Sequence, residues 1–99
     1  MIKHVVMWKF QEMGNGEKEK NIQKAGELLK ALVPIIPQIK AFEFGSDINK
    51  SDAAYDAILI TEFETLEDLS TYQNHPEHQK VSAFITMVRS DRKVVDYVM

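Results

Sequence analysis

The chain has 99 residues, of which 44% are hydrophobic and 27% are charged. This composition is typical of a globular protein and excludes a disordered chain, and the length predicts a single domain spanning residues 1–99. Twelve basic and fifteen acidic residues give a formal charge of −3, without a basic run that could follow a phosphate backbone, so we expect no nucleic-acid partner. The absence of cysteine excludes disulfides and thiolate chemistry. No apolar stretch approaches the roughly 20 residues of a membrane helix, so we expect a cytoplasmic protein without a membrane partner.

The first half of the chain predicts a strand, a helix and a second strand. Residues 2–10 alternate, and the set that contains Val6 and Trp8 is apolar except for His4. After the turn at residues 14–16, apolar side chains recur every three or four positions over 17–33, which indicates a helix that the following prolines end. Residues 39–45 alternate again and predict the second strand.

The second half repeats this order. Residues 55–63 predict a strand that is apolar on both faces at its centre. Thr65 is a typical N-cap for a second helix, which we expect to be interrupted at residues 74–77 around Pro76 and to continue beyond it. Residues 90–93 are expected to turn the chain, and residues 94–98 predict the last strand.

The order β-α-β-β-α-β predicts an α+β, ferredoxin-like fold with a four-stranded antiparallel sheet and two helices on one face. The other face of such a sheet stays uncovered. Because the central strands are apolar on both faces, we expect a homodimer through the sheet face, which is the commonest way to bury such a surface.

The segment from Tyr72 to His78 contains the residues most suited to chemistry. A helix break can direct side chains from its two sides toward one point, so Tyr72 and His78 are expected to converge near His4 at the start of the first strand. Such a cluster would combine imidazoles that titrate near neutral pH with a phenol donor, in a pocket for a small-molecule ligand. His75 is a further candidate for this pocket, although a polar side chain at a helix start is more often a cap or a surface residue.

Other kinds of site lack support in the sequence. The histidines have neither the spacing nor the carboxylate of a zinc motif, so we expect no metal. The glycines before the first helix lack the remaining pattern of a phosphate-binding loop, and no serine lies in a nucleophile elbow, so we expect no cofactor and no acyl-enzyme chemistry.

Four segments resemble the stress-responsive A/B barrel (Dabb) family: Ile-Lys-His-Val-Val-Met-Trp-Lys-Phe at the start, Val-Pro-Ile-Ile-Pro, Tyr-Gln-Asn-His-Pro-Glu-His, and Val-Val-Asp-Tyr near the end. The resemblance covers essentially the whole chain and implies a ferredoxin-like monomer that pairs into a dimeric α+β barrel.

The resemblance also implies a chemistry. The family includes plant polyketide cyclases of the olivetolic acid cyclase type, which promote an intramolecular aldol condensation. By this resemblance His78 would be the catalytic base, Tyr72 its orienting or oxyanion-binding partner, and His4 a donor that lines the pocket. The first helix departs from the plant enzymes, because it offers Gln23 and Glu27 where they carry a tyrosine. Two alternatives stay open: a non-enzymatic, stress-associated structural barrel, and a cofactor-free monooxygenase.

Overall fold

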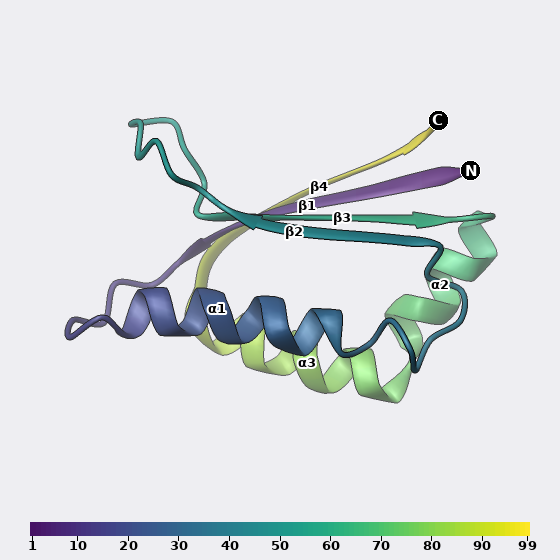
Figure 1. Ribbon diagram of the computed structural model, residues 1–99, viewed down its shortest axis with the longest axis horizontal. Helices are drawn as coiled ribbons and strands as arrows, with labels where there is room; N and C mark the ends of the chain where they lie inside the picture. Colours follow the sequence, from purple (N-terminus) through teal and green to yellow (C-terminus); the bar gives the residue numbers. More distant parts are fainter.

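The computed structural model describes residues 1–99 as one four-stranded antiparallel sheet with helices on one side (Figure 1). The strands lie in the order β2-β3-β1-β4. In chain order the elements are β1 (Ile2–Phe10), α1 (Glu17–Lys30), β2 (Ala41–Ser46), β3 (Ala57–Phe63), α2 (Leu66–Asn74), α3 (Pro76–Val88) and β4 (Arg89–Val98). This arrangement confirms the predicted α+β, ferredoxin-like fold.

The core lies between the sheet and helices α1 and α3 (Figure 1). One alternating set of side chains on β1 and β3 is buried beneath the helices, and it includes Val6, Trp8, Leu59 and Phe63. The helices supply the other half of the core through one apolar stripe each, with Ala25, Leu29, Val81 and Ile85 among the buried residues. The apolar residues of the strands, which recur every two positions, and those of the helices, which recur about every 3.6, therefore pack together in one apolar layer.

The break between α2 and α3 follows from two caps. Thr65 Oγ1 accepts a hydrogen bond from the Asp68 amide at 3.0 Å, which starts α2 as predicted. His75 ends α2 in an extended conformation, because the following Pro76 disfavours a helical backbone at that position. His75 Nδ1 then accepts from the Glu77 amide at 3.1 Å and caps α3, where Pro76 occupies the first turn.

Two predicted boundaries were wrong. Helix α1 ends at Lys30 rather than at residue 33, and a series of turns leads from it toward the proline-rich segment. Residues 90–93 do not turn the chain, because β4 already begins at Arg89, directly after α3. The polar composition of 89–93 was misleading: this is an edge strand with solvent-exposed positions, and its pairing with β1 includes a register shift at Lys9/Phe10.

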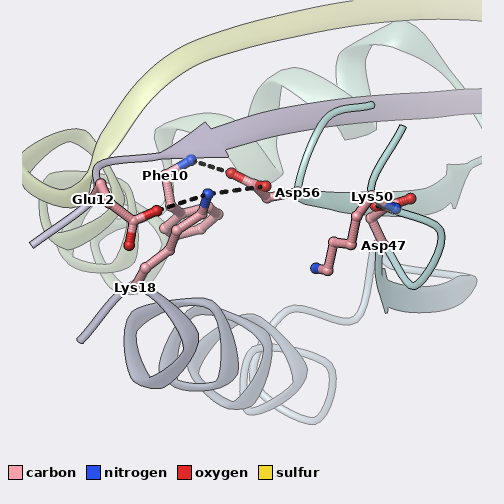
Figure 2. A network of polar contacts seen from close by, with 6 residues as sticks. All are labelled: Phe10, Glu12, Lys18, Asp47, Lys50 and Asp56. Atoms are coloured by element: carbon pink, nitrogen blue, oxygen red, sulfur yellow. Dashed lines mark hydrogen bonds and ion pairs between the residues drawn. The ribbon is translucent and has the colours of Figure 1, made fainter. Parts of the chain in front are cut away.

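A carboxylate anchors the loop before β3 to the end of β1 (Figure 2). Asp56 Oδ2 accepts a hydrogen bond from the Phe10 amide at 2.8 Å, and Asp56 Oδ1 lies 3.4 Å from Lys18 Nζ. Lys18 also lies 3.5 Å from Glu12, so α1, the end of β1 and the loop before β3 share one ionic network. The network fixes the end of the sheet at which α1 begins.

The second face of the sheet has no helix over it (Figure 1). Val5 lies between Ile60 on β3 and Val95 on β4, and Met7 lies opposite Ile58, so an apolar surface runs across three strands. Lys3 and Glu62 form a 3.9 Å ion pair toward one end of this face. None of the helices combines the length and the apolarity that crossing a membrane requires.

Candidate functional site

A cavity of about 220 Å³ lies between the sheet and helix α3. Its apolar wall comes from both layers of the fold: Val6, Trp8, Leu29, Leu59 and Ile85. Its polar groups are His4, Tyr72 and His78 at one part of the wall, with Ser82, Thr86, Arg89 and Arg92 completing the lining. The lining is therefore mixed, with six hydrophobic residues among twelve, and it can offer a small organic molecule both apolar contact and hydrogen bonds.

The three residues expected to converge do lie together. The rings of Tyr72 and His78 are 4.3 Å apart between centroids, and those of Tyr72 and His4 are 6.3 Å apart. Tyr72 ends up between the two imidazoles because it lies in the last turn of α2, His78 lies in the first turn of α3, and His4 lies on the covered face of β1. The helix break is therefore what gathers the cluster.

Tyr72 is only 2% exposed as a residue, and its hydroxyl makes no hydrogen bond to another protein group. The hydroxyl oxygen is not fully enclosed, because the only fully buried side-chain oxygen without a partner belongs to Thr61. A phenol on the cavity wall without a protein partner is an available donor for a ligand. Burial raises the pKa of Tyr72, against the lowering effect of the Arg92 charge. The phenol therefore keeps its proton throughout the neutral range and stays a donor.

The imidazole of His78 is fixed in one tautomer. Its Nδ1 lies 3.1 Å from the carbonyl oxygen of Gln73, and because a carbonyl can only accept, Nδ1 carries the proton. Nε2 is then left with a free lone pair. Burial lowers the pKa of His78, and the charges of His4 and Arg92 act in the same direction, outweighing the opposing effect of the Gln73 carbonyl. His78 is consequently neutral and basic at pH 7.

His4 is buried beneath the helices and forms a hydrogen-bonded pair with a carboxylate. Its Nδ1 contacts Asp96 Oδ1, and Asp96 is its register partner on β4. A carboxylate on Nδ1 orients the ring and leaves Nε2 as the nitrogen that is free for a ligand. The pairing also explains how an imidazole can lie in an apolar layer, because its Nδ1 has a hydrogen-bond partner there.

Some candidates lie elsewhere. His75 does not line the cavity, because its Nδ1 is engaged as the cap of α3. Gln23 and Glu27 are hydrogen-bonded to each other at 3.1 Å and line a separate groove between α1 and β2. Leu29 is the residue that α1 contributes to the cavity. The structure contains no group of three histidine or carboxylate side chains placed to share a metal ion.

Sequence reasoning missed Asp96, Arg89 and Arg92. All three lie on β4, whose first half was expected to be a turn, so no face could be assigned to its arginines. The available signal for Asp96 was an acidic residue inside an otherwise apolar strand, Val-Val-Asp-Tyr-Val, which requires a partner on one face.

Residues 2–99 match the model of the family described as the stress responsive A/B barrel domain, Dabb. The chain belongs to the Dabb family. A dimeric protein of unknown function with a ferredoxin-like fold, from Bacteroides fragilis, is similar over 99% of this chain and 95% of its own, with a TM-score of 0.91 and 28% identity. The Arabidopsis thaliana protein At3g17210 is similar over 100% of this chain and 95% of its own, with a TM-score of 0.83 and 27% identity.

The same fold occurs in an enzyme. Hydroxynitrile lyase from Passiflora edulis is similar over 99% of this Dabb chain and 92% of its own, with a TM-score of 0.84. Its identity to this chain is 16%, which establishes a common fold and nothing finer.

Proposed function

We propose that this Dabb protein binds a small carbonyl compound in the cavity and catalyses proton transfer at the carbon next to the carbonyl group. His78 acts as the general base and Tyr72 as the hydrogen-bond donor to the carbonyl oxygen. The observation that carries the proposal is the phenol of Tyr72 on the cavity wall, which has no protein hydrogen-bond partner and whose ring packs against the ring of His78, an imidazole with a free Nε2. Donor and base on one wall are what enolate formation requires.

The step is balanced within the site. His78 Nε2 takes the proton from carbon, the C–H electron pair forms the carbon–carbon double bond of the enolate, and negative charge develops on the oxygen that faces Tyr72. A neutral histidine whose pKa lies below its ordinary value can accept the proton and return it at neutral pH. The enolate can then be reprotonated, or its carbon can add to a second carbonyl group, as an aldol cyclase requires.

His4 supports the same step as a second positioned imidazole. Because Asp96 engages Nδ1 of His4, Nε2 is the ring nitrogen that is left to make a hydrogen bond with a ligand. The rings of His4 and Tyr72 pack edge to face with their centroids 6.3 Å apart, so both can contact one ligand from the same part of the cavity wall.

The size of the cavity restricts the substrate. About 220 Å³ is below the 300–1,000 Å³ of pockets that enclose drug-sized ligands. A compact carbonyl compound therefore fits better than a long polyketide chain. We accordingly propose the type of reaction that the plant cyclases catalyse, but not their polyketide substrates.

Hydrogen–deuterium exchange tests the proposal directly. A set of small ketones and aldehydes is incubated in D₂O with the protein, and loss of the proton signal next to the carbonyl is followed by NMR. We expect exchange above the buffer rate for at least one compound, and a loss of at least about 100-fold in His78→Ala, the usual contribution of a positioned base.

The matched control is His75→Asn. It removes a second histidine of the same segment but keeps a side chain that can cap α3, so it should retain the exchange rate. Equal rates in wild type and His78→Ala would remove His78 from the mechanism. Absence of exchange with every compound would contradict the enzymatic proposal and favour a binding or structural role.

We further propose that two copies pair through the uncovered face of the sheet. Val5, Met7, Ile58, Ile60 and Val95 form a continuous apolar surface on that face, with Met7 and Val95 more than one third exposed. Monomeric proteins rarely leave so large an apolar surface in water. The Bacteroides fragilis relative is described as dimeric, which supports the same assembly here.

A further inference from the structure

We infer that Arg89 and Arg92 form a carboxylate-binding subsite of the cavity, and that the substrate is therefore a small oxo acid. The inference deepens the proposed function: that the substrate has an oxo group rests on the proposed proton transfer next to a carbonyl. The carboxylate site itself rests on the two arginines and can be tested without any reaction.

Both arginines lie on the covered side of the sheet. Arg92 is the register partner of Trp8 and Arg89 that of Phe10, and both Trp8 and Phe10 are buried beneath the helices. Arg89 also directly follows α3. Both side chains line the cavity that contains Tyr72 and His78.

The junction between α3 and β4 is held in place. The Gln11 amide donates to the carbonyl oxygen of Val88 at 2.8 Å, and Gln11 Nε2 donates to the carbonyl oxygen of Arg89 at 3.0 Å. Because β1 and β4 also share a ladder that reaches Arg89, the backbone at this position is restrained from two sides. A restrained backbone presents the Arg89 side chain in a defined direction.

Neither guanidinium group forms an ion pair within the protein. The two acidic residues of the same strand are already engaged: Asp96 pairs with His4, and Asp91 accepts a hydrogen bond from the Tyr55 hydroxyl at 2.5 Å. The chain as a whole is acidic, with a formal charge of −3, so two unpaired arginines on one cavity wall are a local exception. Arginine binds planar carboxylates through two parallel hydrogen bonds, so an anion of this shape is the complementary ligand.

A polar track joins this subsite to the proposed base. His78, Ser82, Thr86 and Arg89 follow one another at spacings of four, four and three residues, which places them along one side of α3 and its end, and all four line the cavity. The positive charge of Arg92 also acts at the reactive end: it adds to the lowering of the pKa of His78 by burial, and it opposes the raising of the pKa of Tyr72 by burial. A ligand with its carboxylate at the arginines can thus extend its carbonyl group toward Tyr72.

Binding of benzoate and benzamide tests the carboxylate site. The two probes have nearly the same shape and differ in charge, and neither has an acidic C–H group, so the measurement does not depend on catalysis. By calorimetric titration at low ionic strength we expect the wild-type protein to bind benzoate at least tenfold more tightly than benzamide. Arg92→Gln and Arg89→Gln should each reduce this preference, whereas Lys80→Gln, which removes an exposed charge on α3, should retain it.

Equal binding of the two probes, or no detectable binding of benzoate at millimolar concentration, would overturn the carboxylate site. A loss of preference in Lys80→Gln equal to that in Arg92→Gln would also overturn it, since the effect would then come from net charge alone. Circular dichroism of each variant verifies that the fold is kept.

The substrate class is tested with 2-oxo-, 3-oxo- and 4-oxopentanoate and their methyl esters in the D₂O exchange assay. We expect at least one acid to exchange tenfold or more faster than its ester, and Arg92→Gln to abolish that ratio. Exchange that depends on His78 but is equal for acid and ester would overturn the oxo-acid assignment and leave the proposed function standing. A benzoate preference without any His78-dependent exchange would overturn the proposed function and leave the carboxylate site standing.

Discussion

At the scale of single residues, the state of His78 is the property on which the proposed chemistry depends. Burial lowers its pKa, so the folded protein favours neutral imidazole, and the catalytic base is lost only when the pH falls below that pKa. We therefore expect kcat/KM for exchange to be constant above the ordinary histidine value of about 6.5 and to decline with falling pH, with its midpoint below 6.5. A pH–rate profile measures this; a midpoint above 6.5, or a rate that rises in acid, would contradict the assignment.

Thr61 carries a buried hydroxyl group for which the protein offers no hydrogen-bond partner. It is fully buried opposite His4 on the sheet, and its hydroxyl has no hydrogen-bond partner. A buried, unsatisfied hydroxyl is destabilising, so Thr61→Val should raise the free energy of unfolding by about 1 kcal/mol, with Thr61→Ser as the control that keeps the hydroxyl and loses a methyl group. Urea denaturation at one fixed protein concentration measures both. A loss of stability in Thr61→Val would show that the hydroxyl makes a favourable interaction.

At the scale of elements, the close approach of α1 to β2 depends on Gly26. A Cβ atom at this position would lie 2.7 Å from the ring of Phe44, which is closer than van der Waals contact allows. Gly26→Ala should therefore destabilise the protein by about 1 kcal/mol or more, although alanine is the better helix former. In a Phe44→Leu background the same change should become neutral or stabilising. Thermal denaturation of the four proteins tests this cycle, and an equal effect of Gly26→Ala in both backgrounds would contradict it.

The break between α2 and α3 shows how local sequence positions a site. The break can be predicted from the sequence, because capping by Thr65 and His75 and the geometry of Pro76 act over neighbouring residues. The break in turn brings Tyr72 and His78 together, so this half of the cluster was predictable. The half on β4 was not, because a polar edge strand and a polar turn have the same composition, and only the pairing with β1 distinguishes them.

At the scale of the whole molecule, the uncovered sheet face should determine the oligomeric state. Ile60 lies opposite Val5 at the centre of the apolar surface on this face. Ile60→Lys would place a charge in the proposed interface, so we expect it to convert the dimer into a monomer with the secondary structure retained. Met87→Lys, an apolar-to-lysine change at an exposed position on α3, is the control. Light scattering coupled to size-exclusion chromatography gives both masses, and a wild-type monomer or an Ile60→Lys dimer would contradict the proposed pairing.

The sequence by itself determined the order of the elements, the fold class and the two-sided apolar character of the sheet. These features depend on periodicity, capping and proline geometry, which act over a few neighbouring residues. It also pointed to His4, Tyr72 and His78, while leaving His75 undecided between pocket and cap. The tertiary structure decided that His75 is the cap, that Asp96 pairs with His4, and that Arg89 and Arg92 line the cavity. The cap at His75 is a local contact, whereas the positions of Asp96, Arg89 and Arg92 depend on the strand register between β1 and β4, which are more than 75 residues apart. A one-residue shift in that register would have turned these three side chains to the other face.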